Sequence, residues 1–85
     1  MKYYLYILKS KTADKYYTGI SQNPERRLTY HNSIERGFTS RYRPWAVEFT
    51  KEYENREQAH QAELKVKSWK SKEMVEKLVR GEIQF

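Results

Sequence analysis

Apolar and aromatic residues concentrate in three short stretches of the chain, and each stretch has the composition or the alternation of a β-strand. Residues 3–8 and 15–21 are rich in tyrosine, isoleucine, leucine and threonine, and a polar segment containing lysines separates them. Such a pair of runs predicts a β-hairpin. Over residues 45–50, large apolar side chains alternate with small or polar ones, which predicts a half-buried strand that ends at residue 52 or 53.

The register of the hairpin decides which tyrosines meet. If the hairpin is symmetric about residues 11 and 12, Tyr6 lies directly across from Tyr17, and Tyr4 faces Gly19. Paired residues of neighbouring strands are close enough for their side chains to touch. We therefore expect the phenols of Tyr6 and Tyr17 to lie on one face of the sheet.

Three segments carry the signals of helix starts. Asn23, followed by Pro24 and an acidic residue, predicts a short helix that ends at residue 31 or 32. Asn55 and Gln58 form a variant of the capping box, and apolar positions then recur at intervals of three and four. Ser71 begins a further short amphipathic segment. The sequence leaves open whether the last two segments are separate helices or one kinked helix.

Residues 32–43 show no sustained hydrophobic period, and we predict a loop there. A loop of this length in a small domain is usually functional or disordered. Arginines in it can contact phosphates, while aromatic faces stack on bases. In the alternative interpretation, which is compatible with the first, its aromatic residues pack back onto the core. The arginines and aromatic residues that alternate in this loop are Arg36, Phe38, Arg41, Tyr42 and Arg43.

Together these elements predict an α+β fold, with a small three-stranded antiparallel sheet flanked by helices, and 85 residues predict a single domain over residues 1–85. The absence of cysteine excludes disulfides and thiol catalysis. No stretch resembles a signal peptide or a membrane span, so we expect a cytoplasmic protein without a membrane partner. A net charge of +6 and a pI of about 9.6 favour a polyanionic partner.

Glu63 is the least expected residue of the second predicted helix. It lies on the same stripe as Ala59 and Val66, which the periodicity predicts to be buried. A buried carboxylate needs a partner, because removing its charge from water costs several kcal/mol. The partner is either a divalent metal beside a substrate phosphate or a nearby cation. The candidate cations are Lys65, Lys67 and Arg27.

The order and spacing of these residues resemble the GIY-YIG nuclease superfamily, and most closely its small stand-alone members, which are related to the nuclease domain found in DNA excision repair. Tyr4-Leu5-Tyr6 stands where the family has Gly-Ile-Tyr, and Tyr17-Thr18-Gly19 where it has Tyr-Ile-Gly. Arg27 follows on the first helix, with His31 four residues later on the same helical face. Glu63 matches the metal-binding glutamate of the family.

The resemblance implies hydrolysis of a phosphodiester bond by water, assisted by one Mg²⁺ (or Mn²⁺) ion held by Glu63. Arg27 would grip the scissile phosphate and stabilise negative charge in the transition state. Tyr17 or Tyr6 would orient or deprotonate the water. A free phenol titrates near 10, so such a base needs a nearby cation. His31 is the other candidate base, or else it orients a tyrosine.

The implied partner is nucleic acid, with DNA preferred over RNA, and we expect a monomer or a weak homodimer. The alternative is a nucleic-acid-binding module of the same fold that turns over little or nothing. A protein-interaction domain with an incidental basic surface is a third, weaker hypothesis. The residues expected to contact nucleic acid are Arg36, Arg41, Tyr42, Arg43, Lys65 and Lys67.

Overall fold

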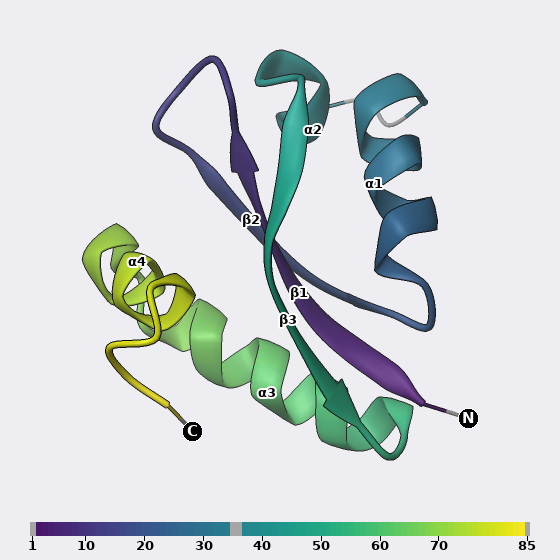
Figure 1. The fold of residues 1–85 in the computed structure, drawn as a ribbon, viewed down its shortest axis with the longest axis vertical. Coiled ribbons are helices and arrows are strands. Elements are labelled where there is room, and N and C mark those ends of the chain that lie inside the picture. The colour runs from purple at the N-terminus through teal and green to yellow at the C-terminus, as the bar shows by residue number, and fades with distance from the viewer. Residues whose placement is uncertain (1, 35–36, 85) are drawn as a thin grey trace.

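The computed structural model describes residues 2–34 and 37–84 and has the predicted α+β architecture. The elements are β1 (Tyr3–Ser10), β2 (Tyr16–Ser21), α1 (Pro24–Ser33), α2 (Phe38–Arg41), β3 (Trp45–Tyr53), α3 (Arg56–Ser68) and α4 (Lys72–Val79). The strands form one antiparallel sheet in the order β2-β1-β3. Helices α1 and α2 lie on one side of this sheet, and α3 and α4 lie on the other (Figure 1). In the described part of the chain, no helix is long and apolar enough to cross a membrane.

The sheet is buried on both faces because alternate residues of its central strand enter two different cores. Leu5 and Ile7 pack with Val66 and other apolar residues of α3 and α4. Tyr6 and Leu8 point the other way and form a second cluster with residues of α1, β2 and β3. This explains why residues 5–8 are all buried and show no simple alternation of polar and apolar types.

The predicted register of the hairpin is wrong by two residues. Tyr6 pairs with Gly19, and Leu8 rather than Tyr6 lies opposite Tyr17. The assumed centre of the hairpin was wrong, because the pairing runs on to Lys9 and Tyr16, and the Ser10 amide donates to the Lys15 carbonyl, which centres the turn on residues 12 and 13. A shift of two residues keeps every side chain on its predicted face. Tyr6 and Tyr17 are therefore diagonal neighbours, with ring centroids 6.4 Å apart.

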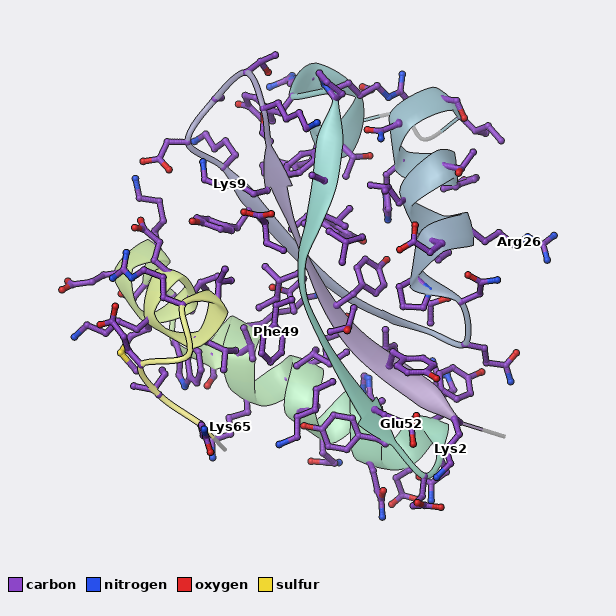
Figure 2. All side chains as sticks on the ribbon, viewed as in Figure 1. Lys2, Lys9, Arg26, Phe49, Glu52 and Lys65 are labelled. Atoms are coloured by element: carbon purple, nitrogen blue, oxygen red, sulfur yellow. The ribbon has the colours of Figure 1, made fainter. Side chains whose placement is uncertain are left out.

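The simple alternation predicted for the third strand is also interrupted. Ile7 pairs with Phe49 and Leu8 with Val47, so Glu48 is an extra residue that forms a β-bulge. Val47 consequently packs with the cluster of Leu8, while Phe49 packs with the cluster of Ile7. Figure 2 shows Phe49 on the side of the sheet that faces α3. One strand thus contributes to both cores.

The predicted helix starts are confirmed by their capping contacts. The side-chain oxygen of Asn23 accepts a hydrogen bond from the Arg26 amide at 3.1 Å, and that of Asn55 accepts one from Gln58 at 2.9 Å. The Ser71 hydroxyl accepts from the amide of Met74 at 3.3 Å. The last two helical segments are therefore separate helices.

The predicted loop of residues 32–43 contains a short helix, α2, which begins after a glycine with Phe38, a residue that is 46% exposed. The Phe38 ring lies 5.1 Å from that of Tyr42 and 5.9 Å from that of Trp45, between centroids. Four residues give too short a periodic pattern to be recognised in a sequence. Arg36 lies outside the described residues.

Candidate functional site

The phenol of Tyr6 is the centre of a buried polar group. Its side chain enters the sheet face covered by α1, where Tyr6 is only 1% exposed. Its Oη lies 3.1 Å from Nε2 of His31. Burial raises the pKa of Tyr6, and hydrogen bonding to the Arg27 guanidinium acts in the opposite direction. At neutral pH the phenol is therefore protonated, and it interacts with two side chains of α1, those of His31 and Arg27.

His31 is completely buried, and both of its ring nitrogens are engaged. Its Nδ1 lies 3.4 Å from the hydroxyl of Thr39 on α2. Which partner donates in these two contacts depends on the tautomer of the imidazole. The contact with Tyr6 is compatible with the orienting role considered for His31 from the sequence, which stays a prediction.

Gly19 provides the space that the Tyr6 ring occupies. A Cβ atom at this position would lie 2.6 Å from Oη and 2.8 Å from Cζ of Tyr6. Both distances are shorter than carbon side chains tolerate, so the ring can cross β2 only where no side chain stands. The motif glycine is thus required for close packing across the strand pair.

Tyr17 and Arg27 border the same buried group but are more accessible than Tyr6. The Tyr17 ring is half-buried and lies 4.6 Å from the His31 ring, between centroids. The guanidinium of Arg27 lies over the ring of Tyr30 at 4.5 Å. Arg27 also lines an open depression of about 580 Å³ at the end of β2 and the start of α1. A ligand in this depression could reach the guanidinium.

Glu63 approaches from α3, the helix layer on the opposite side of the sheet. Its side chain is 14% exposed and pairs with Nζ of Lys67 at 3.0 Å and Nδ1 of His60 at 3.3 Å. Lys67 is one of the cations expected from the sequence as a partner. The charge of Glu63 also contributes to raising the pKa of Tyr6, after the larger effect of burial. The carboxylate therefore acts electrostatically on the phenol although the two side chains come from different layers.

Comparison with known proteins identifies the family to which this arrangement belongs. The sequence profile described as the GIY-YIG catalytic domain matches residues 2–77. The chain belongs to the GIY-YIG family. It is similar to the UPF0213 protein BH0048 from Bacillus halodurans, whose structure was solved by solution NMR, with a TM-score of 0.59 and 30% identity. That match covers 94% of this chain and 84% of the other. No curated protein matches the sequence significantly.

The two tyrosine motifs of this nuclease-type family can now be located in the sheet. Tyr4-Leu5-Tyr6 and Tyr17-Thr18-Gly19 lie on adjacent strands, and Tyr6 and Tyr17 share one face of the sheet. Thr18 replaces the isoleucine of the family motif and faces the opposite side of the sheet from Tyr17. The departure leaves the face that carries the phenols unchanged.

Glu63 of this GIY-YIG chain is chemically suited to hold a hard divalent cation. Among residues 2–34 and 37–84, no three or more acidic, histidine or cysteine side chains are grouped as a metal site. Mg²⁺ commonly takes only one or two protein carboxylates and retains several waters. A carboxylate offers about four lone-pair positions, so Glu63 keeps acceptor capacity beyond its contacts with His60 and Lys67. The residues present fit such an ion.

The other residues expected to bind nucleic acid are distributed over different surfaces of the GIY-YIG fold. Nε of Arg43 donates to the His31 carbonyl at 2.7 Å, and Tyr42 packs in the core cluster beside Trp45. Arg41 is exposed at the end of α2.

Figure 2 shows Lys65 projecting from α3 away from the sheet. Lys67 contacts the candidate site through Glu63.

The sequence analysis did not anticipate the contact of His60 with Glu63. His60 precedes Glu63 by three residues, and this spacing places two side chains on one face of a helix. That spacing could have indicated the contact between His60 and Glu63. A glutamate on a helix has several possible partners at similar spacing, however, and the sequence does not show which of them it contacts. Tyr30, whose ring lies against Arg27, was missed as well.

Proposed function

We propose that this GIY-YIG protein is a metal-dependent endonuclease that hydrolyses phosphodiester bonds in DNA. The observation that supports this proposal best is the convergence of side chains on the Tyr6 phenol. The Tyr6 hydroxyl is hydrogen-bonded to His31 and interacts with the Arg27 guanidinium, and among the groups that influence its pKa the charge of Glu63 has the smallest effect. A phenol beside a guanidinium is suited to binding a phosphate and a water, and a carboxylate can add a cation.

Arg27 would bind the scissile phosphate, because it lines the open depression and carries a permanent positive charge. There it would stabilise the negative charge that develops in the transition state. Tyr17 would orient the attacking water, because its half-buried ring is more accessible than that of Tyr6. Tyr6 would act as a protonated hydrogen-bonding group, since burial raises its pKa. His31 would hold Tyr6 in position.

Glu63 would hold the Mg²⁺ or Mn²⁺ ion, with water and phosphate oxygens as the remaining ligands. Lewis-acid activation of the phosphate and of the water is the chemistry that such a cation supplies. The contact with Lys67 would orient the carboxylate.

The test is cleavage of plasmid and branched DNA with and without Mg²⁺ or Mn²⁺. We expect the wild-type protein to cut only with the cation. Glu63→Gln and Arg27→Ala should each lower the rate by about 10²–10³-fold, the loss typical of removing one group that stabilises transition-state charge. The matched controls Glu48→Gln and Arg80→Ala change the same residue types at exposed positions away from the site. Cleavage by Glu63→Gln and Arg27→Ala at the wild-type rate, with all variants folded, would contradict the proposal.

A second candidate function is a nucleic-acid-binding module with little or no turnover. The observation that favours it is that both oxygens of Glu63 already contact cationic or proton-bearing groups, Lys67 and His60. In the same assay this candidate predicts salt-sensitive DNA binding without cation-dependent cutting.

A further inference from the structure

Two depressions border the edge strand β2, one at each end. The depression at its C-terminal end is lined by Ile20 and Ser21 of β2, and by Arg27 and Arg56; we call it the arginine depression. The depression at its N-terminal end has a volume of about 360 Å³ and is lined by Thr18 of β2 and by residues of the hairpin loop, α3 and α4. We call it the lysine depression, and its charged residues are Asp14, Lys15, Lys67, Lys70 and Lys72.

One stripe of α3 connects the two depressions. Arg56, His60, Glu63 and Lys67 recur at intervals of four, three and four, so they lie along one side of the helix. The first of them lines the arginine depression, and the last lines the lysine depression. Glu63 lies between them. The distance along the helix from Arg56 to Lys67 is about 16 Å at the usual rise per residue.

The lysine depression keeps a positive charge after its internal ion pairs are counted. Asp14 is its one acidic lining residue within the described chain, and it is paired with Lys72. Lys67 is paired with Glu63. Lys70 takes part in no ion pair in the part of the chain that the structure describes. The depression therefore presents positive charge that its own acids do not neutralise.

Lys70 is held at this place by the corner between α3 and α4. Its backbone has a φ of 49°, which is the left-handed conformation that residues with a Cβ rarely adopt. The N-cap of α4 follows directly at Ser71. The turn of the chain thus brings Lys70 and Lys72 to the same depression.

We propose that the sugar-phosphate backbone of one DNA strand runs along β2 and α3, from the arginine depression past Glu63 to the lysine depression. This inference rests on the proposed function and extends it from the reacting phosphate to its neighbours. A strand advances about 3.4 Å per nucleotide, so the 16 Å of α3 matches about five nucleotides. Arg56 contacts the strand on one side of the reacting phosphate, and Lys70 and Lys72 contact it on the other.

The test measures how DNA affinity depends on salt, without added divalent cation so that the DNA is not cut. Each lost phosphate contact on duplex DNA lowers the slope of log K against log salt concentration by about one. We expect Lys70→Ala/Lys72→Ala to bind more weakly, with a slope smaller by about two. Arg56→Ala should lower the slope by about one. Asp14→Asn should bind more tightly, because it removes the acid of the lysine depression.

The control is Lys51→Ala/Lys77→Ala, which removes two lysines that line neither depression. Lys77 is paired with Glu73, as Lys72 is with Asp14, so each double variant removes a lysine that is paired with an acid. Since the corner tolerates glycine, Lys70→Gly is a second variant in case Lys70→Ala disturbs folding.

If Lys70→Ala/Lys72→Ala and the control bind alike while the wild-type protein binds and cuts DNA, the inference is wrong and the proposed function stands. If the wild-type protein binds no DNA even at low salt, both are wrong.

Discussion

At the scale of single residues, the candidate site depends on one buried hydroxyl with defined partners. Tyr6 has a hydrogen bond to His31, and His31 in turn contacts Thr39. Among the described residues, no buried side-chain nitrogen or oxygen lacks a partner. A fully satisfied network of this kind fixes the ring orientation of its members. The protein therefore presents a positioned, protonated phenol at the site.

The ionisation of Tyr6 gives a prediction at this scale. Its pKa lies above the ordinary value of 10.0 because burial disfavours the phenolate. The folded protein keeps this proton at a pH where the unfolded chain has lost it. The corresponding stability is therefore fully present below pH 10.0 and is lost as the pH rises through the raised pKa.

We expect a titration of tyrosinate absorbance to show late-ionising tyrosines, since burial also raises the pKa of Tyr16 and Tyr53. Tyr6→Phe should remove one late component and make the free energy of unfolding less sensitive to alkaline pH. Ionisation of all tyrosines together near the ordinary value would contradict the buried position of Tyr6.

At the scale of elements, the strands and helix starts follow from local patterns, but their exact pairing does not. The capping residues Asn23, Asn55 and Ser71 act on amides three residues away, so a sequence is enough to recognise them. The register of β1 and β2 depends on where the hairpin turns. The bulge at Glu48 lets β3 place Val47 in one core cluster and Phe49 in the other. Both are consequences of packing between distant residues.

The pair of Tyr6 and Gly19 gives a prediction for these two strands. Gly19→Ala places a Cβ atom within 2.6 Å of Oη of Tyr6, so the ring must move. Gly19 needs no left-handed backbone, and its role is steric. We expect the free energy of unfolding to fall by about 1–3 kcal/mol, the usual cost of overpacking a core.

The control for this prediction is the same substitution in a Tyr6→Val background, where the smaller side chain leaves room. Denaturant unfolding of the four variants of this double-mutant cycle measures the coupling. If Gly19→Ala lowers the free energy of unfolding equally in both backgrounds, the glycine is not required to make room for the Tyr6 ring.

At the scale of the whole molecule, the candidate residues come from both sides of the sheet. Arg27 lies on α1 and Glu63 on α3, and these two helices cover opposite sides of the sheet (Figure 1). The family resemblance indicated these residues from their order along the chain. Sequence could not indicate that His60 and Lys67 share the carboxylate of Glu63, because a helix face offers several partners of similar spacing.

The central claim is that Glu63, Tyr17 and Arg27 serve one site although they come from opposite layers. The most direct test is titration of the isotope-labelled protein with Mn²⁺, followed by NMR line broadening. We predict that resonances of Tyr17, Arg27 and the middle of α3 broaden first, and that Glu63→Gln abolishes this effect while Glu48→Gln does not. Broadening confined to other surfaces, or unchanged in Glu63→Gln, would contradict a shared site.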